Sequence, residues 1–337
     1  MPRFATIGLD HRHIYDLTKG LLAAGAECAG YNPDTSDARV LTGFRKRFPW
    51  APAADTERLL DDPSIDFVVI AAVPRDRADP AIAAMQRGKD VMVDKPGVTT
   101  TDQLDALRRA VTGTGRFWLV ALGRLASPAQ QAALHIVRAG ELGRLVHITS
   151  LAPHRLNRAL RPAWFFDPPA YGGVINDIGV HSIDLFLALA EATDADIVHS
   201  AVGAFGTGPA GFEDCAELVL AIPSVRGYIR LDWFTPDGLP TWGDGRLFIV
   251  GTEGTLELRK NLDMEGRSGT DHMFTANRST TRYIDCSALP VTCYRDFVTG
   301  VAVGQHSVMP QQQVFSASRL ALEAQARATY YISRPPQ

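Results

Sequence analysis

Cysteine is scarce in this sequence: the 337 residues contain 4 cysteines, at positions 28, 215, 286 and 293. No two of them form a Cys-x-x-Cys pair, so the sequence lacks the signature of a cysteine zinc site or of a dense disulfide framework. Such sparse use of cysteine is typical of a reducing compartment. The first apolar strand begins at about residue 3, which leaves no room for a secretory leader, and we therefore expect a cytoplasmic protein.

An excess of charge is also absent, since 34 lysines and arginines face 37 acidic residues and the formal net charge is −3. Nucleic acids and anionic membrane surfaces attract proteins with a basic excess, so neither is an expected partner. No uninterrupted apolar run reaches the roughly 18 residues that a membrane-spanning helix needs. The histidines show no spacing typical of metal ligands, and no metal is expected.

The first 120 or so residues alternate short apolar runs with amphipathic stretches. We expect strands at 4–8, 27–31, 67–72, 90–93 and 117–122, with helices such as 14–24 and 80–87 between them. This alternation is typical of a parallel sheet with crossover helices, and uninterrupted apolar strands indicate burial on both faces. Because the chain is long enough for two domains, we predict an α/β domain with a doubly wound parallel sheet over residues 1–123.

The pattern changes after residue 122. A helix at 128–138, a strand at 145–151 and a helix around His181 are followed by strands in sequence order, at 197–205, 215–222, 227–234, 247–250 and 255–258. Helices at 291–301 and 310–330 then close the chain. Consecutive strands favour antiparallel pairing. Residues 124–337 are therefore predicted to form an α+β domain with a large, mostly antiparallel open sheet.

The segment 172–184 carries Asp177, His181 and Asp184 at helical spacing. Separations of four and seven residues return to nearly the same side of an α-helix, so the Asp177 carboxylate can reach the His181 imidazole. Imidazole changes protonation near neutral pH, and a paired histidine can carry a proton. An Asn-Asp pair before an apolar run is also typical of a helix N-cap, and both interpretations stay open.

Lys95 follows the apolar segment 90–94 and precedes Pro96. It is therefore expected at the carboxyl end of a strand, which is the edge where open parallel sheets bind ligands. The alternative is a surface lysine that merely follows a strand. If both groups are catalytic, either Lys95 or His181 could be the immediate proton acceptor.

The turn after the first strand reads Gly8-Leu9-Asp10-His11-Arg12-His13. In dinucleotide-binding domains this turn holds pyrophosphate against a helix N-terminus. Only Gly8 fits the Gly-x-Gly-x-x-Gly pattern, because Asp10 and His13 stand where the other glycines would fall. Asp10 is interpreted as a helix cap, and His11, Arg12 or His13 as donors to phosphate. The alternative is a solvated polar turn.

The second strand ends at Asn32, where an acidic residue would favour NAD and an arginine NADP. Asparagine can bond a ribose hydroxyl without repelling a phosphate, so the choice stays open, with a slight preference for NAD because no arginine immediately follows. Further cofactor contacts are expected at the ends of the third and fourth strands, from Ala72, Val73, Pro74, Asp94, Lys95 and Pro96.

Four segments in order, 59–70, 79–96, 172–184 and 250–256, make the chain resemble the Gfo/Idh/MocA family of glucose-fructose oxidoreductase and inositol dehydrogenase. The resemblance runs nearly end to end. It implies an NAD(P)-dependent oxidoreductase with a Rossmann domain and an α+β domain, whose open sheet makes a homodimer or homotetramer interface. It also implies a sugar, a polyol or a related small molecule as substrate.

The resemblance further implies residue roles. The family's Glu-Lys-Pro motif maps onto Asp94-Lys95-Pro96, with aspartate in place of glutamate, and its catalytic aspartate and histidine map onto Asp177 and His181. Hydride would pass between nicotinamide and a C–OH or C=O carbon of the substrate. Lys95 and His181 would handle the proton, and Asp177 would orient His181 and hold its tautomer.

Substrate specificity is expected from the second domain. Polar and aromatic residues near the predicted catalytic helix are candidates to line a polyol pocket: Arg155, Asn157, Trp164, Tyr171 and Asp184. An aromatic residue in such a segment is more often part of a core than a sugar platform. For Asp184 the favoured interpretation is a polar residue that supports the helix or the surroundings of His181.

Two other functions remain open on this fold. One is a non-catalytic NAD(P)-binding sensor, which the missing glycines favour and the retained Lys95, Asp177 and His181 oppose. The other is a hydrolase or lyase that keeps NAD tightly bound and oxidises its substrate transiently.

Overall fold

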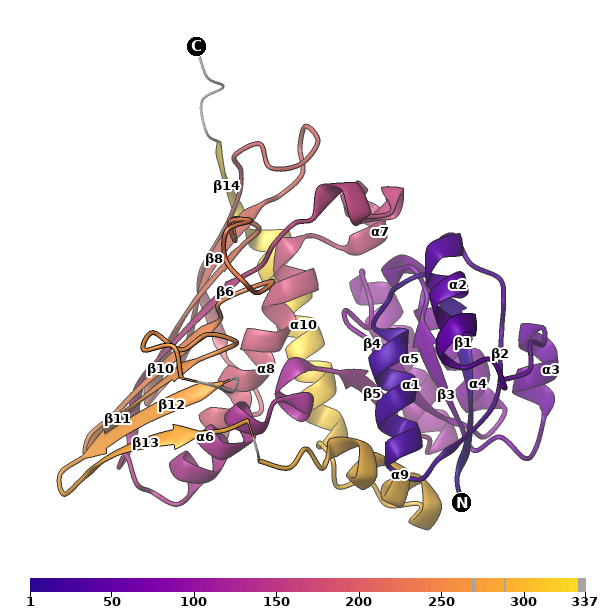
Figure 1. Ribbon diagram of the computed structural model, residues 1–337, viewed down its shortest axis with the longest axis horizontal. Helices are drawn as coiled ribbons and strands as arrows, with labels where there is room; N and C mark the ends of the chain where they lie inside the picture. The colour runs from indigo at the N-terminus through magenta and orange to yellow at the C-terminus, as the bar shows by residue number, and fades with distance from the viewer. Residues whose placement is uncertain (268–270, 288, 333–337) are drawn as a thin grey trace. The chain divides into compact units, whose positions relative to one another are not determined.

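The computed structural model describes residues 1–267, 271–287 and 289–332 (Figure 1). The chain divides into two compact units. Unit 1 comprises residues 1–122, 162–172 and 292–319, and unit 2 comprises 123–161, 173–291 and the residues from 320 onward. The predicted boundary at 123/124 lies one residue after the first break between the units. Two later segments that were assigned to the second domain pack with unit 1.

Unit 1 is built on a parallel sheet with the order β2-β1-β3-β4-β5. All five residues of β3 and all five of β4 are buried, as expected for strands covered on both faces. The strand order reverses between β1 and β3, which marks the switch point where such sheets bind ligands. The predicted doubly wound parallel sheet is confirmed. Its strands are β1 (Arg3–Leu9), β2 (Glu27–Tyr31), β3 (Phe67–Ala71), β4 (Asp90–Asp94) and β5 (Trp118–Ala121).

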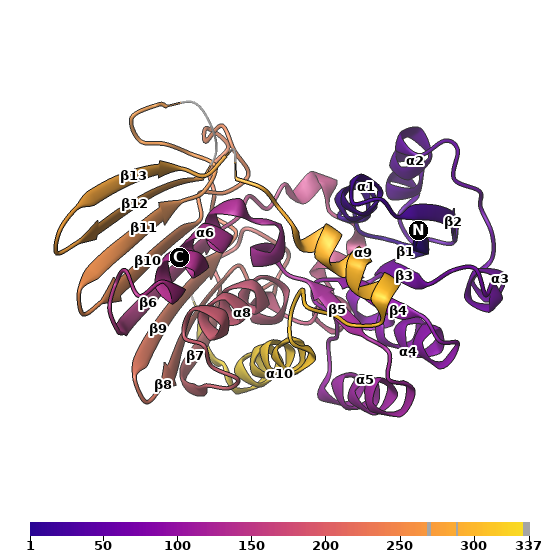
Figure 2. The same ribbon diagram turned by 90° about the horizontal axis from the view of Figure 1, so that it is seen from below.

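Helices cover both faces of this sheet: in Figure 2, α1 and α9 lie on one side and α4 and α5 on the other. Helix α9 comes from far along the chain, and its Phe297 ring lies 5.2 Å from that of Phe67 in β3. The two helices predicted by range, 14–24 and 80–87, correspond to α1 and α4, and α2, α3 and α5 are further helices between the strands. The bounds are α1 (Ile14–Ala23), α2 (Ala38–Arg47), α3 (Thr56–Asp61), η1 (Pro74–Asp76), α4 (Ala78–Gln86), α5 (Thr101–Thr114), η4 (Ala163–Phe166), α7 (Pro168–Tyr171) and α9 (Cys293–Val303).

Unit 2 contains a sheet with the order β13-β12-β11-β10-β6-β9-β8-β7-β14. Most neighbours are antiparallel, as predicted, but β6 pairs with β9 and β7 with β14 in parallel. Three strands of this sheet, β12, β13 and β14, were not predicted from the sequence. The bounds are β6 (Leu145–Pro153), β7 (Asp196–Ala204), β8 (Cys215–Ile222), β9 (Val225–Asp232), β10 (Arg246–Gly251), β11 (Gly254–Arg259), β12 (His272–Asn277), β13 (Thr281–Asp285) and β14 (Thr329–Ile332).

Helices α6 (Pro128–Arg138) and α8 (Val180–Leu189) cover one face of the unit 2 sheet (Figure 1, Figure 2). Close packing of α8 depends on a glycine in β9, because a Cβ at Gly227 would lie 2.6 Å from the Phe186 ring. The remaining helical segments are η2 (Gly123–Ala126), η3 (Arg158–Leu160), a π-helical turn (Ile175–Gly179) and α10 (Gln311–Arg327), which begins in unit 1 and continues into unit 2.

One helical stretch, residues 168–189, is long and apolar enough to span a membrane by length and composition alone. The expectation that no uninterrupted apolar run reaches this length is not contradicted, since Asn176, Asp177, His181 and Asp184 interrupt the stretch. Of the most apolar part of this stretch, 89% is buried inside the protein, as in the core helix of a folded domain. Packing within the protein therefore accounts for its apolar character.

Replacing Gly227 by alanine should loosen the packing of α8 on β9. The added methyl group meets the buried Phe186 ring at 2.6 Å, which is closer than van der Waals contact allows. We expect a loss of about 1–3 kcal/mol in the free energy of unfolding, measured by urea denaturation. Gly238→Ala is the matched control, since a Cβ there meets no atom within 4 Å. Equal stability of the two variants would contradict this account of the packing.

Candidate functional site

The turn after β1 brings the Gly8 backbone against the end of β3. Gly8 has φ +70°, and a Cβ there would lie 2.4 Å from the Cβ of Ala72. Only glycine combines a left-handed backbone with so close an approach. The amides of Asp10 and His11 both donate to the carbonyl of Ala71. The close crossing that a dinucleotide-binding turn requires is therefore kept, although two glycines of the pattern are missing.

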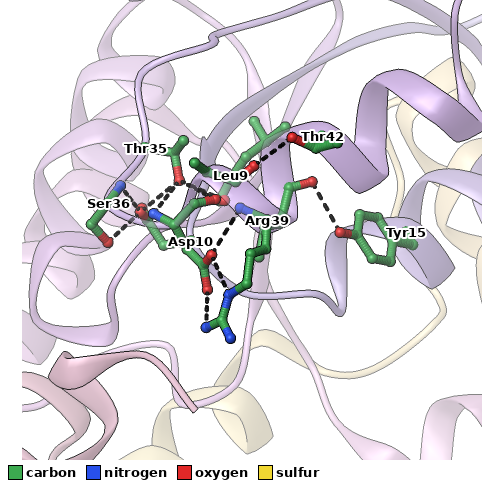
Figure 3. Close-up of polar contacts among 10 residues, drawn as sticks. Leu9, Asp10, Tyr15, Thr35, Ser36, Arg39 and Thr42 are labelled. Carbon is green, nitrogen blue, oxygen red and sulfur yellow. Dashed lines mark hydrogen bonds and ion pairs between the residues drawn. The ribbon is translucent and has the colours of Figure 1, made fainter. Parts of the chain in front are cut away.

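The Asp10 carboxylate points toward the loop after β2 (Figure 3). It accepts hydrogen bonds from the hydroxyls of Thr35 and Ser36 and from the Ser36 amide. Helix α1 has its N-cap at His13, with no side-chain cap. The prediction that Asp10 caps this helix is therefore wrong, and its carboxylate instead ties together two loops that flank the nucleotide position of a Rossmann domain.

Asn32 is buried at the end of β2, and its Oδ1 accepts the Asp34 amide at 3.0 Å. Arg39 is the first arginine after this strand. Its guanidinium donates twice to Asp37, at 3.1 and 3.0 Å. Arg39 is thus already neutralised by its own loop, and the slight preference for NAD stays a prediction.

Asp94 at the end of β4 is the centre of a buried polar cluster. Its carboxylate lies 2.6 Å from His11 Nδ1 and 2.9 Å from His13 Nδ1, and it accepts a 3.1 Å bond from Arg77. Since an ionised carboxylate only accepts, both Nδ1 atoms carry hydrogen. Arg77 is fully buried and donates to three backbone carbonyls as well, those of Ala72, Asp94 and Pro96. Lys95 follows directly, and the Lys95–Pro96 peptide bond is cis.

Charges within this cluster are set by burial. Desolvation lowers the pKa of His11 from 6.5 to about 3, with His13 adding to the effect and Asp94 opposing it. Burial works against ionisation of Asp94, but the charges of His13, Arg77 and His11 hold its pKa well below the usual range. At neutral pH the cluster therefore contains a neutral His11 imidazole and an Asp94–Arg77 ion pair.

His11, His13 and Asp94 also bring possible metal-ligand atoms within 4.8 Å of one another. A divalent ion there would have to displace the histidine hydrogen bonds to Asp94. It would also place positive charge beside the buried guanidinium of Arg77. This arrangement favours a hydrogen-bonded cluster, and the expected absence of a metal stays a prediction.

Trp164 and Tyr171 belong to unit 1, although the sequence placed them in the second domain. The Trp164 ring meets the His11 ring edge to face at 6.0 Å, beside the turn after β1. Tyr171 is 1% exposed and stacks on Phe165 at 6.1 Å. Tyr171 is therefore a core residue, whereas Trp164 lies next to the proposed cofactor turn.

In unit 2, Asp177 lies in the π-helical turn that precedes α8. A π-turn bonds each residue to the fifth one along, so the predicted α-helical spacing from Asp177 to His181 is wrong at its start. The N-cap interpretation of Asp177 is also wrong, because Val174 and Gly179 occupy the cap positions. The amides of Val174 and Ile175, which enter the turn, are accepted by the side chains of Glu213 and Gln325. Both partners are distant in sequence.

The His181 ring is positioned by the backbone. The Gly123 amide donates to His181 Nδ1 at 2.8 Å. An accepting Nδ1 carries a lone pair, so the neutral imidazole holds its hydrogen on Nε2. Protonation of Nδ1 would make two N–H groups face each other. The Gly123 amide therefore favours the tautomer with hydrogen on Nε2, and the predicted role of Asp177 in holding that tautomer stays a prediction.

Asp184 forms a buried ion pair with Arg124, which donates to both carboxylate oxygens at 2.7 and 3.0 Å. The two side chains are 0% and 6% exposed. This geometry favours the supporting role of Asp184 over contact with a substrate. Sequence patterns missed Arg124 because sixty residues separate it from Asp184. They also missed Arg77, whose only signal is an arginine in the turn after the third strand.

The other two proposed substrate residues lie in the loop after β6. Arg155 donates to the carbonyls of Pro236 and Leu239, and thereby holds the loop after β9. Asn157 has a left-handed backbone, with φ 49°, and is exposed. Arg155 thus has a structural role, and contact of either residue with a substrate stays a prediction.

Comparison with known proteins identifies two matching family models. The model of an oxidoreductase family with an NAD-binding Rossmann fold matches residues 13–122, and that of the GFO/IDH/MocA C-terminal domain matches residues 130–257. Among solved structures, that of an oxidoreductase from Erwinia carotovora atroseptica SCRI1043 is 37% identical. The similarity covers 98% of this chain and 99% of that one, with a TM-score of 0.92.

Two characterised enzymes are more distant relatives. Scyllo-inositol 2-dehydrogenase (NAD(+)) of Bacillus subtilis (strain 168) is 29% identical over 57% of this chain and 55% of that enzyme. The match thus spans about half of that enzyme's length. 1,5-Anhydro-D-fructose reductase of Ensifer adhaerens is 27% identical over 81% of this chain and 80% of that enzyme.

Acidification should destabilise the protein through His11. Between pH 6.5, the ordinary pKa, and about 3, the folded-state pKa, the unfolded chain binds more protons, so stability falls as the pH falls. This single group contributes up to about 1.4 kcal/mol per pH unit. Asp94 acts in the same direction, but only near and below the unfolded carboxyl pKa of about 3.9.

His11→Asn keeps a donor near Asp94 but does not titrate, so it should flatten the fall in unfolding free energy between pH 6.5 and about 4.5. Urea denaturation at each pH measures this. His135→Asn, at an exposed position, serves as control and should keep the wild-type slope. A wild-type slope in His11→Asn would show that His11 is not the group responsible.

Proposed function

Because this chain belongs to the Gfo/Idh/MocA oxidoreductase family, we propose that it is an NAD(P)-dependent dehydrogenase or reductase acting on a C–OH or C=O group of a sugar, polyol or related small molecule. The names of the two characterised relatives support a polyhydroxylated substrate. The observation that carries the proposal is the close crossing of Gly8 over Ala72 at the switch point of the parallel sheet.

The residues at the carboxyl edge of the unit 1 sheet suit a dinucleotide. The proposal assigns Arg12 to the pyrophosphate and Asn32 to the ribose, while His11 and His13, whose Nδ1–H groups already donate to Asp94, hold the turn in place. Ala72, Val73 and Pro74 would provide backbone beside the nucleotide, and the Asp94–Arg77 pair would keep Lys95 and Pro96 in place. When bound, the nicotinamide accepts or gives the hydride. The proton then has to be handled by side chains of the protein.

For the proton, the proposal gives different tasks to Lys95 and His181. Neutral His181, with hydrogen on Nε2 and an amide donating to Nδ1, can give a hydrogen bond to the substrate oxygen but has no free lone pair with which to take its proton. Lys95 carries an amine that can give or take a proton. Lys95 is therefore proposed as the proton-transfer group, His181 as the donor that stabilises charge on the oxygen, and Asp177 as a positioning residue.

The cellular location and assembly are proposed as well. The four cysteines form no disulfide in the described part of the chain, in keeping with the proposed cytoplasmic location. The face of the unit 2 sheet opposite α8 carries three aromatic side chains in one cross-strand row, in which Tyr228, Phe248 and Phe274 alternate with Thr149 and Glu257. Phe274 is 45% exposed. Such a row supports a homodimer or homotetramer formed through this face.

A second candidate function is an NAD(P)-binding sensor without turnover. One observation favours it: the amides of Asp10 and His11 donate to Ala71 and are thus already engaged within the protein. Weak phosphate binding would follow. Binding of NAD(P) without turnover across a broad sugar and polyol panel would favour this function over the dehydrogenase.

The activity test offers a panel of sugars and polyols as substrates together with NAD or NADP. Reduction of the cofactor is monitored through the absorbance of the reduced nicotinamide. On the substrate found, Lys95→Ala should lower kcat by about 10² to 10⁴ and remove the pH dependence due to proton transfer. His181→Gln retains an N–H donor and should lose about tenfold or less, with the pH profile kept, whereas His181→Ala should lose about 10². The exposed His135→Gln is the control. If His181→Gln lowers kcat as much as Lys95→Ala does and also removes the pH dependence, His181 is the proton acceptor.

The assembly test uses a charge in the apolar row. Phe274→Glu should reduce the molar mass in solution to that of the monomer, because an ionised carboxylate is costly to bury in an interface. Size-exclusion chromatography with light scattering measures this. Val303→Glu changes an equally apolar residue, 63% exposed at the end of α9, and should leave the mass unchanged. A monomeric wild-type protein would contradict the proposed assembly.

A further inference from the structure

In unit 2, two tryptophans alternate with three basic residues, in the order Lys260, Trp242, His154, Trp233 and Arg161. We call this set the cation–aromatic ladder. Lys260 Nζ lies 5.3 Å from the Trp242 ring centroid, and Arg161 Cζ lies 5.1 Å from that of Trp233. His154 stands between the two tryptophans, with ring centroids 4.8 Å from Trp242 and 5.3 Å from Trp233.

Backbone hydrogen bonds hold the loops that carry the ladder. The His154 amide, directly after β6, donates to the Asp232 carbonyl at 2.8 Å, and the next amide donates to the Trp242 carbonyl at 2.7 Å. Gly243 passes so close that a Cβ would lie 2.4 Å from the carbonyl oxygen of Pro153. The backbone therefore fixes the ladder at the carboxyl ends of the parallel strands β6 and β9.

The ladder begins next to the helix that carries His181. Leu231 and Trp233 continue one face of β9, and both are buried. The Leu231 side chain meets Gly179, the residue immediately before α8, since a Cβ there would lie 3.0 Å from Leu231 Cδ1. Two residues advance a strand by about 7 Å. Trp233 lies just beyond the end of β9, about 7 Å along the chain from the Leu231 side chain that meets Gly179.

Lys260 is the only lysine after residue 95. Within the described ranges of the chain, no hydrogen bond or ion pair joins its ammonium to another residue. Burial lowers the pKa of Lys260, and the charge of Asp271 opposes this shift. Asp271 already accepts the Asn261 amide, and Asp244, at the start of β10, is paired with Arg246 and Arg259. Among the described residues, no carboxylate therefore lies within ion-pair distance of the Lys260 ammonium, and the charge of Asp271 acts on it only from farther away.

Aromatic surface lies open beside this ammonium. Trp242 is 43% exposed, an unusual state for a large ring packed between a lysine and a histidine. A tryptophan face favours the C–H face of a sugar ring, and an unpaired, partly desolvated ammonium favours an anion. Arg161, which donates through Nε to the Leu156 carbonyl at 2.8 Å, adds a second positive charge at the other end of the ladder.

We propose that the cation–aromatic ladder binds an anionic group of the substrate, so that the enzyme acts on an acidic sugar or polyol carrying a carboxylate or a phosphate. Lys260 pairs with the anion, and the ring stacks on Trp242. This substrate class rests on the proposed function, whereas the anion site itself does not depend on turnover.

The test measures binding without turnover, by quenching of tryptophan fluorescence and by calorimetry. The probes are D-gluconate and D-glucose 6-phosphate, with neutral D-glucose for comparison, each added to the full-length protein. We expect at least one charged probe to bind about tenfold or more tightly than glucose, a difference of about 1.4 kcal/mol. The better of the two charged probes identifies the anion as carboxylate or phosphate.

Lys260→Met keeps the aliphatic stem and removes the charge. It should weaken the favoured charged probe about tenfold or more and leave glucose binding unchanged, while Lys260→Arg should retain most of the affinity. Lys46→Met, an exposed lysine of unit 1, is the matched control and should bind like the wild type. Circular dichroism confirms that each variant is folded.

Two results would overturn the inference. One is equal affinity for glucose and both charged probes, and the other is a preference for the charged probe that Lys260→Met leaves intact. Failure of the proposed function has a different signature, since charged probes would bind through Lys260 while no substrate in the panel supported nicotinamide reduction.

Discussion

The ion pair between Asp94 and Arg77 is the constraint on which the ligand-binding edge of unit 1 depends. Arg77 is fully buried, and one guanidinium bonds the Asp94 carboxylate together with three backbone carbonyls from the segments after β3 and β4. The same carboxylate accepts hydrogen bonds from His11 and His13, and these bonds attach the turn after β1 to the ion pair as well. Breaking a buried pair by removing one partner typically costs about 3–5 kcal/mol, because a charge is then left uncompensated. One such pair therefore keeps three neighbouring strand ends in register at the place where a nucleotide would bind.

Unit 2 uses the backbone in the same way, to fix polar groups that would otherwise turn freely. The Gly123 amide sets the orientation and the protonated nitrogen of His181, and the adjacent Arg124 buries the carboxylate of Asp184 beneath the same helix. At the N-terminal end of the π-helical turn that precedes this helix, the side chains of Glu213 and Gln325 accept hydrogen bonds from backbone amides. The Nδ1 atom of the imidazole is thus fixed as an acceptor, which suits the role proposed for His181 of stabilising charge without reorganising.

The parts of this structure that sequence could predict are those set by local periodicity. Buried strands such as β3 and β4 consist of uninterrupted apolar residues, and the position of Lys95 follows from the strand before it. The π-helical turn around Asp177 was not predictable, because it depends on caps from Glu213 and Gln325, far along the chain. The same holds for the Gly123–His181 contact and for the docking of α9 in unit 1, where Phe297 meets Phe67. Polar side chains such as Asp10 were misassigned for a similar reason, since their partners come from another loop.

The crossing at Gly8 has a consequence for how nucleotide-binding proteins are recognised in genomes. Where side chains rather than bare backbone secure the turn, only the glycine at the crossing itself is sterically irreplaceable, and the other two positions are free to diverge. A search that counts glycines would pass over such chains. A more informative fingerprint would combine one glycine, two histidines separated by a single residue, a buried arginine after the third strand and an acidic residue at the end of the fourth.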